Sequence, residues 1–335
     1  MKSCAKMRAV VPNAKRRAAP HRRPSKHRSM ARKPATMHGF VVVDKPAGIT
    51  SHDVVSRLRR RFSERRVGHS GTLDPDATGV LIVALGNATR LLQFLGDLPK
   101  SYSGEVVFGT ATSTLDASGE VTATCDMSAL SVERVREAAK ALTGEILQVP
   151  PMVSAIKVGG RRLHEIAREG GEVERAPRPV TIHRFVVGDV VERVDENPVV
   201  AIDVTCSSGT YIRTLAADLG ELLGGVAHLR NLRRRAIGDF IVGDVHDATS
   251  IDTAPLQSAV AVMAHLDGVN ITMALVDDAT AAKVRNGRSL ETLGVADGRD
   301  GERRIVLNER HELIAVYSRT SSDWRPEVVM PEPLA

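Results

Sequence analysis

One segment of the chain joins a glycine-rich turn to an apolar run: Gly68-His69-Ser70-Gly71-Thr72-Leu73-Asp74-Pro75-Asp76-Ala77-Thr78-Gly79-Val80-Leu81. Its glycines permit backbone angles that other residues resist, and Pro75 pushes Asp74 toward an extended conformation. The apolar run from Val80 to Leu85 predicts a buried strand. A carboxylate is therefore expected at the rim of a core strand. Residue types alone leave two interpretations of Asp74, a functional group or an aspartate that closes an ordinary turn.

The rest of the sequence alternates between strand-like and helix-like segments. Short apolar or alternating runs predict strands over residues 40–43, 101–112, 180–187 and 199–206. Periodicity and capping residues predict helices over residues 51–62, 87–95, 131–142 and 209–223. We expect Ser51 and Asn87 to be the N-caps of the first two helices, because their side chains can accept a hydrogen bond from the first turn. This mixture is typical of an α+β protein.

Composition excludes several classes of protein. The 335 residues are 42% hydrophobic and 26% charged, and no run of about 18 apolar residues could span a bilayer. No apolar segment follows the charged N-terminus, so we expect a cytoplasmic protein without a secretory signal. The three scattered cysteines form neither a disulfide framework nor a metal pair, and the phosphate-binding pattern Gly-x-x-x-x-Gly-Lys-Ser/Thr is missing. We therefore expect chemistry that uses acids, bases and positioning, without a metal.

Charge is unevenly distributed along the chain. Residues 1–36 contain twelve Lys or Arg and no Asp or Glu, so the net charge of +6 divides into +12 for this segment and −6 for the remainder. The composition of residues 1–36 predicts a disordered tail. The tail is either an arm that attracts RNA electrostatically or a passive extension, including one created by a misassigned start codon upstream of Met30 or Met37.

Three further regions have recognisable patterns. A cluster of arginines in the acidic body is either a nucleic-acid-binding surface or the solvated face of a helix: Arg57, Arg59, Arg60, Arg61, Arg65 and Arg66. Glycine pairs at 159–160 and 170–171 bound a basic segment that predicts a short helix with mobile ends. From about residue 269 onward, short alternating segments predict a small β-rich domain.

Three motifs, in this order, resemble those of the TruB family of tRNA pseudouridine synthases. The first is His38-Gly39-Phe40-Val41-Val42-Val43-Asp44-Lys45-Pro46-Ala47-Gly48-Ile49-Thr50-Ser51, the second is the segment from Gly68 to Leu81, and the third is Gly209-Thr210-Tyr211-Ile212-Arg213. The resemblance extends from about His38 to about Ile241 and becomes weak beyond that point.

The resemblance implies a fold and a division into domains. It implies an α+β pseudouridine-synthase core with a mixed, mainly antiparallel sheet and flanking helices, over residues 37–265. A thumb-like insertion at about 158–179 would close on the RNA. Residues 266–335 would form a small β-rich RNA-binding domain that resembles a PUA module.

The resemblance also implies roles for individual residues. Asp74 matches the catalytic aspartate, Arg213 matches the arginine that pairs with it and holds it ionised, and Tyr102 matches the tyrosine that stacks on the target base. The substrate-binding residues that it implies are His69, Lys45, Tyr211, Lys157, Arg161 and Arg162. Without the resemblance, Tyr102 would be a packed strand tyrosine and His69 a turn residue with a local backbone hydrogen bond. One departure is Val153, where the family commonly has tyrosine, and it puts in doubt an aromatic contribution from that side.

The activity that the resemblance implies is isomerisation of the T-loop uridine conventionally numbered 55 in tRNA to pseudouridine. It requires no cofactor, and the expected partner is the tRNA T-arm, with a monomeric enzyme, no membrane and no obligatory protein partner. Asp74 would act as a nucleophile at C1′ or as a base at C2′. Two alternatives are an RNA-binding module that unfolds the T-arm without chemistry and an RNA-guided enzyme of the same superfamily.

Overall fold

The computed structural model of the protein describes residues 35–154, 157–163, 166, 169–171, 173–241, 251–266, 271–291 and 298–335. The predictions for the basic tail concern residues outside these ranges, apart from residues 35 and 36, and they stay predictions. No helix among the described residues has the length and apolar character needed to cross a bilayer.

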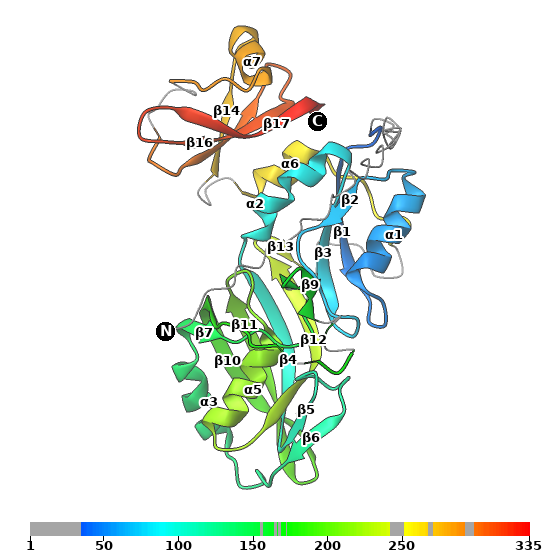
Figure 1. Ribbon diagram of the computed structural model, residues 1–335, viewed down its shortest axis with the longest axis vertical. Helices are drawn as coiled ribbons and strands as arrows, with labels where there is room; N and C mark the ends of the chain where they lie inside the picture. The colour runs from blue at the N-terminus through cyan, green and yellow to red at the C-terminus, as the bar shows by residue number, and fades with distance from the viewer. Residues whose placement is uncertain are drawn as a thin grey trace, which may run out of the picture. The chain divides into compact units, whose positions relative to one another are not determined.

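A nine-stranded sheet forms the centre of the fold, in the order β1-β3-β12-β4-β11-β10-β7, with β13 paired to β12 and β2 paired to β3 (Figure 1). Its strands are β1 (Gly39–Lys45), β2 (Val67–His69), β3 (Thr78–Leu85), β4 (Lys100–Phe108), β7 (Gly144–Gln148), β10 (Arg178–Val194), β11 (Asn197–Cys206), β12 (Ala227–Ile237) and β13 (Phe240–Ile241). In the described part of the chain, β3 and β12 are its one parallel pair. The predicted α+β fold with a mainly antiparallel sheet is confirmed.

Helices cover both faces of the part of the sheet formed by β1 and β3. The helices whose bounds lie in the described part of the chain are α1 (Ser51–Arg61), the 3₁₀ helix η1 (Gly86–Leu91), α2 (Leu92–Gly96), α3 (Val132–Ala141), α5 (Ile212–Leu222), α6 (Ala259–Ala264) and α7 (Asp278–Arg285). Side chains alternate between the faces of a strand, and here Val41 and Val43 pack with α1, whereas Phe40 and Val42 pack with η1, α2 and α6. Burial on both faces explains why these strands are apolar throughout.

A second core lies under α3 and α5, which cover one face of β4, β10, β11 and β12 (Figure 1). Its buried residues include Val106, Ile202, Leu215 and Leu219. This packing fixes the start of α5 against the sheet, and it therefore fixes the position of the side chains in the first turn of that helix.

Two predicted caps differ from the structure. Thr50, not Ser51, is the N-cap of α1: its hydroxyl accepts a hydrogen bond from the Asp53 amide, and the Asp53 carboxylate accepts one from the Thr50 amide. Asn87 lies inside η1, where its side chain accepts a hydrogen bond from Arg66. Neither predicted residue caps its helix, because its side chain binds a residue that is distant in the sequence. The Ser51 hydroxyl binds the Leu73 backbone, and the Asn87 side chain binds Arg66.

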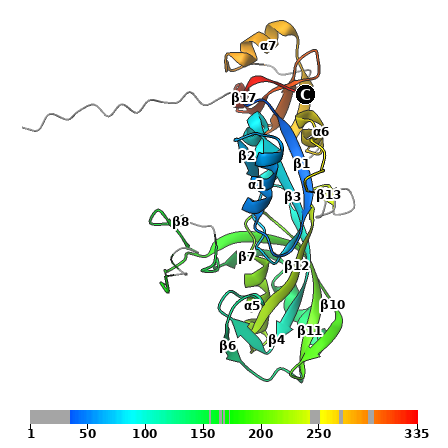
Figure 2. The same ribbon diagram turned by 90° about the vertical axis from the view of Figure 1, so that its right-hand side faces the viewer.

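The basic segment after residue 156 begins as a β-hairpin rather than a helix. Its strands are β8 (Lys157–Val158) and β9 (Arg161–Arg162), and the turn residues Gly159 and Gly160 have φ of 58° and 85°. Such angles favour glycine at both central positions of a two-residue hairpin turn. The prediction of a helix was therefore wrong at Arg161 and Arg162. Figure 2 shows this hairpin standing away from the main sheet.

The C-terminal residues form the β-rich unit that the sequence predicted. Its sheet has the order β14 (Ile271–Leu275), β15 (Arg303–Leu307), β16 (Leu313–Arg319) and β17 (Trp324–Leu334), with α7 against it. Tyr317 and Trp324 are fully buried in its core. Residues of this sheet share a hydrophobic cluster with η1 and α2, and residues Ala35–Ala335 form one compact unit.

A further hairpin is formed by β5 (Thr110–Thr112) and β6 (Val121–Thr124).

Candidate active site

Asp74 lies in the loop that connects β2 to β3, and this loop is held from two sides. The Leu73 amide donates to the Ser51 hydroxyl at 2.9 Å, and that hydroxyl donates to the Leu73 carbonyl at 3.1 Å. The Lys45 ammonium donates to the carbonyls of Pro46 and Ile49 at 2.7 Å and of Pro75 at 2.9 Å. The residues on each side of Asp74 are therefore both fixed by side chains of the first motif.

Lys45 is completely buried, and burial lowers its pKa to about 8. Its three hydrogen bonds go to backbone carbonyls, which use all three ammonium donors. It does not line the cavity described below. These contacts show that Lys45 fixes the backbone conformation of the loop that carries Asp74.

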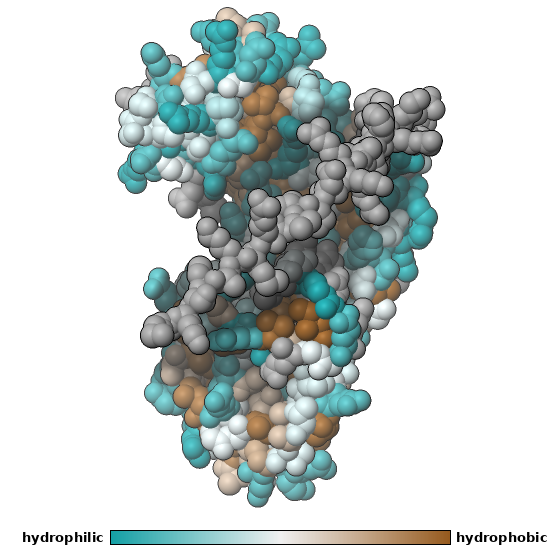
Figure 3. Space-filling view, viewed as in Figure 1, coloured by the Kyte–Doolittle hydropathy of each residue, from teal (hydrophilic) through white to brown (hydrophobic). Residues whose placement is uncertain are grey.

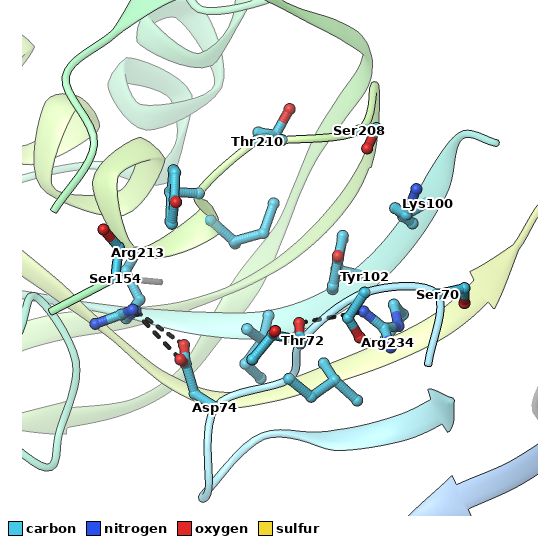
Figure 4. A pocket seen from close by; sticks show the side chains of 16 residues that line it. Ser70, Thr72, Asp74, Lys100, Tyr102, Ser154, Ser208, Thr210, Arg213 and Arg234 are labelled. Carbon is cyan, nitrogen blue, oxygen red and sulfur yellow. Dashed lines mark hydrogen bonds and ion pairs between the residues drawn. The ribbon is translucent and has the colours of Figure 1, made fainter. Parts of the chain in front are cut away.

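Arg213, in the first turn of α5, reaches the Asp74 carboxylate. Its Nε lies 3.0 Å from one Asp74 oxygen and its Nη2 lies 3.4 Å from the other, so two donors of one guanidinium face the carboxylate (Figure 4). The Arg213 side chain is 5% exposed, whereas that of Asp74 is 38% exposed. Its remaining donors reach the carbonyls of Thr114 and Val153, both at 2.9 Å. The sequence-predicted pairing of these two residues is present in the structure.

The start of α5 is held by a residue that the sequence did not single out. Gln148 is buried, its side-chain oxygen accepts a hydrogen bond from the Tyr211 amide at 3.0 Å, and its nitrogen donates to the Tyr211 carbonyl at 3.2 Å. Tyr211 is the N-cap of α5 and has no capping side-chain hydrogen bond. Gln148 instead binds the backbone of Tyr211 on both sides, and it thereby fixes the residue that lies two positions before Arg213.

Asp116 is a second carboxylate beside Arg213 that the sequence analysis missed. One of its oxygens lies 3.5 Å from the Arg213 guanidinium, and the other accepts hydrogen bonds from the Thr114 hydroxyl and the Ser118 amide. Asp116 lies 42 positions from Asp74 in the sequence, in the loop that follows β5, and no motif marks it. Arg213 therefore stands between two carboxylates.

The pKa of Asp74 is raised above its ordinary value. Burial is the main cause, the Arg213 guanidinium opposes it, and the negative charge of Asp116 adds to it. Arg213 was expected to hold Asp74 ionised by lowering the pKa of its carboxyl; it does act in that direction, but the ion pair offsets only part of the cost of burial. The result is a carboxylate that is oriented by a cation and easier to protonate than one in water.

A cavity of about 280 Å³ opens beside this ion pair. Tyr102, on β4, is almost completely buried in its wall, and burial raises the pKa of its phenol. Figure 4 shows Tyr102 between the Asp74–Arg213 pair and Lys100. Other lining residues include Leu73, Lys100, Tyr211, Ile212, Leu232 and Arg234. A second cavity of about 470 Å³ shares Asp74 and Arg213 with the first. The ion pair therefore forms a wall between two hollows.

Two further predicted substrate-binding residues, His69 and Arg161, are not among the residues that line this cavity. His69 ends β2, and its Nδ1 accepts a hydrogen bond from the Gly71 amide at 3.3 Å, while burial lowers the pKa of its imidazole. Arg161 pairs with Glu169 in the hairpin segment. The side chains of Lys157 and Arg162 lie outside the described residues, so their roles stay predictions. Among the described residues, no three His, Cys, Asp or Glu side chains form a metal-binding group.

Comparison with known proteins shows to which family the sequence of this chain is similar. The profile described as "TruB family pseudouridylate synthase (N terminal domain)" matches residues 59–212. The tRNA pseudouridine synthase B of Mycobacterium tuberculosis strain H37Rv is 45% identical over 304 residues, which cover 89% of this chain and 99% of that protein. The protein of the same name from Bacillus anthracis is 44% identical over 260 residues, covering 76% and 85%.

A solved structure supports the likeness of the fold. A chain in the crystal structure of a Cbf5-Nop10-Gar1 complex superposes with a TM-score of 0.64 at 23% identity, covering 87% of this chain and 84% of that one. The match includes more of the chain than residues 59–212 alone.

Replacement of Arg213 by alanine should raise the pKa of Asp74 further, because the guanidinium that stabilises the ionised carboxylate is lost. A carboxyl whose folded pKa lies above its unfolded value destabilises the fold once pH exceeds the unfolded pKa. The loss of unfolding free energy in Arg213→Ala should therefore be larger at pH 7 than at pH 4. NMR titration of the side-chain carboxyl carbon, with urea unfolding at both pH values, measures this. Arg230→Ala, which removes an arginine bound to Glu105, is the control; an unchanged Asp74 pKa in Arg213→Ala would contradict the analysis.

Proposed function

This chain belongs to the TruB family of pseudouridylate synthases, and from that membership we propose that it isomerises the T-loop uridine 55 of tRNA to pseudouridine, with Asp74 as the catalytic carboxylate. The coarser assignment, tRNA pseudouridine synthase, follows from the relatives that align with most of the chain. The observation that supports the finer one is the Asp74 carboxylate, oriented by Arg213 at the edge of a cavity that Tyr102 lines.

The reaction makes specific demands on a site. The bond between N1 of uracil and C1′ of ribose breaks, the base turns, and a bond forms between C5 and C1′, while N1 gains a proton and C5 loses one. A carboxylate must reach the sugar, and the detached base must be kept from water and from escape. No electrons are transferred to or from the substrate.

The residues around the cavity fit these demands. Asp74 is the partly exposed carboxylate, and Arg213 holds both of its oxygens, so that its orientation is fixed before substrate binds. The Tyr102 ring would support the flipped uracil, as aromatic faces do for bases outside a stack. Leu73, Ile212 and Leu232 supply apolar walls. The ionised form of Asp74 is required whether it attacks C1′ as a nucleophile or removes a proton from C2′ as a base.

The basic cluster on α1 and the turn after it would contact the RNA backbone. Among the described residues, none of its six guanidinium groups pairs with a carboxylate, whereas Arg59, Arg61 and Arg66 donate to backbone or amide oxygens. The start of α1 is bound to Leu73 through Ser51, so that Arg57 and Arg60 lie about 9–14 Å along the helix from the site loop. Unpaired cations this close to the site favour a polyanionic partner.

Further parts of the proposal follow the domain division expected from the sequence. Residues 37–265 would be the catalytic domain, the insertion at about 158–179 the thumb that closes on the T-arm, and residues 266–335 an RNA-binding domain of PUA type. We expect the single chain to act on a T-arm hairpin without a guide RNA or a protein partner.

Asp74→Asn should leave folding and tRNA binding intact and lower kcat by roughly 10⁴-fold or more, because the amide can neither attack C1′ nor accept a proton. Release of tritium from C5-labelled uridine in a T-arm hairpin measures turnover. Asp76→Asn is a matched control, since Asp76 is an exposed aspartate two residues away. Turnover near the wild-type rate in Asp74→Asn, or equal losses in the two variants, would refute the assignment.

Tyr102→Leu should lower kcat/KM by roughly 5- to 150-fold, the loss of about 1–3 kcal/mol expected when one base loses its aromatic stacking partner. Tyr102→Phe should keep most of the activity, because the ring remains. Tyr317 is buried in the C-terminal sheet, where its hydroxyl donates to the Arg288 carbonyl, so Tyr317→Phe is the control for loss of a tyrosine hydroxyl elsewhere. Equal activity of Tyr102→Leu and wild type, at matched thermal stability, would show that Tyr102 only packs the sheet.

The combined substitution of Arg57, Arg60 and Arg65 by glutamine should reduce the steepness with which tRNA affinity falls with salt. Three lost phosphate contacts should lower the slope of log Kd against log salt by about 2–3, with kcat unchanged at saturation. Filter binding over a salt series measures the slope. The control removes three other exposed arginines, Arg134, Arg184 and Arg235, for the same change in net charge. If both triple variants have the same slope, the α1 cluster does not contact RNA.

A further inference from the structure

Arg234, on β12, is a cation buried in the wall of the site. Its side chain is 1% exposed, and among the described residues it donates to backbone carbonyls and interacts with the Tyr102 phenol, whereas it pairs with no carboxylate. Nε donates to Val80 at 2.7 Å, Nη2 to Gly71 at 3.2 Å and Nη1 to Thr72 at 3.5 Å. Figure 4 shows Arg234 beside Thr72. A buried charge without a counter-ion is costly, and an apolar side chain could fill the same space. Packing alone therefore does not explain an arginine here.

The carbonyls that Arg234 contacts belong to the segments on both sides of Asp74. Gly71 and Thr72 lie three and two positions before Asp74, and Val80 lies in β3, the strand that follows it. One planar guanidinium thus holds both arms of the loop. A lysine ammonium could not reproduce this, because its donors diverge from a single nitrogen, whereas those of arginine are spread over a rigid fork.

The backbone of Arg234 connects the same loop to the aromatic wall. Arg234 is the register partner of Tyr102 in β4 on one side and of Gly79 in β3 on the other. Gly79 has φ of 110°, and a Cβ atom there would lie 2.1 Å from the Arg234 carbonyl oxygen, so only glycine allows this approach. Arg234 is therefore the residue through which the loop of Asp74 and the strand of Tyr102 are joined.

We propose that Arg234 is a positioning residue for the isomerisation, whose guanidinium fixes the Asp74 loop relative to the Tyr102 ring. This inference rests on the proposed function, because it is the sugar and the base of one nucleotide that Asp74 and Tyr102 must contact together. It predicts a larger loss in turnover than in RNA binding, since the Arg234 side chain, although it borders the cavity, is only 1% exposed and donates to backbone carbonyls of the loop.

The test compares Arg234→Met and Arg234→Lys with Arg235→Met and Arg235→Lys in the full-length protein. Arg235 is the exposed neighbour in the same strand, so it controls for a change of charge and of side chain in β12. Arg234→Met should lower kcat on a T-arm hairpin by roughly 10- to 100-fold with KM changed less than threefold, as expected for a misplaced catalytic group. Arg234→Lys should show a smaller loss of kcat in the same direction. If Arg234→Met does not fold, the kcat of Arg234→Lys tests the proposal by itself.

Two readouts separate positioning from a general loss of structure. Hydrogen exchange of amides 71–74 should become faster in the Arg234 variants, while exchange in α5 stays as in the wild type. The acid limb of the pH–rate profile should keep its position, because the charged groups that face Asp74 are Arg213, Asp116, Lys45 and Asp76.

Three results would overturn the proposal: wild-type kcat in a folded Arg234 variant, unchanged exchange in the loop, or a loss of activity that follows the loss of thermal stability in all four variants. A wild-type enzyme that forms no pseudouridine would instead refute the proposed function, and the exchange measurement would still report on the loop.

Discussion

The guanidinium of Arg213 is a full positive charge placed in the protein interior, and the architecture of the site follows from the need to satisfy it. Its N–H groups reach two carboxylates and two backbone carbonyls, which come from three separate segments: the β2–β3 loop, the loop after β5 with Thr114 and Asp116, and the segment that contains Val153. Each of these segments is held in place by its own contacts. Gln148 holds the start of α5, and Ser51 and Lys45 hold the loop of Asp74. The geometry of one ion pair therefore depends on contacts across most of the main sheet.

Buried cations that donate to backbone carbonyls recur around this site. Lys45, Lys100 and Arg234 are each less than a tenth exposed, and all three bind carbonyl oxygens of turns or loops. Burial lowers the pKa of Lys100 to about 8, as it does for Lys45. A carbonyl oxygen carries only a partial charge, so these contacts leave much of each positive charge uncompensated. The region behind Asp74 is therefore electropositive, which suits a site that receives a polyanion and must keep a carboxylate usable in a partly buried position.

Local sequence signals predicted the elements whose structure is decided locally. Strands β1 and β3 and helix α3 follow apolar runs or helical periodicity, and Ser131 caps α3. The sequence did not predict strand β12, because its arginines interrupt the alternation of apolar and polar residues that marks a strand. Arg233 and Arg234 contact different partners, and Asn231, with φ of 53°, interrupts the hydrogen-bond ladder. The Gly159-Gly160 pair was itself a hairpin signal that the basic composition of the segment obscured.

The candidate site likewise contains residues that local sequence signals predicted and residues that they did not. Asp74, Tyr102 and Arg213 were predicted because they lie in motifs that resemble those of a family, whereas Asp116, Gln148 and Arg234 were missed because their partners at the site lie between 63 and 163 positions away in the sequence. Only the fold brings such residues to the site, and no local pattern records the contact. The pKa of Asp74 was mispredicted for a related reason. A sequence can show that a cation is available, but the extent of burial depends on the complete surroundings of the carboxyl.

The contact between Arg213 and Val153 bears on how this site tolerates sequence drift. Val153 contributes its backbone carbonyl, so the hydrogen bond at 2.9 Å makes no use of the valine side chain. Any residue that keeps the local backbone path can supply the same oxygen, so a side-chain substitution at this position leaves the hydrogen bond to Arg213 in place. Of the four acceptors of Arg213, the two main-chain oxygens therefore tolerate substitution at the positions that supply them, whereas the two carboxylates are lost when Asp74 or Asp116 is replaced.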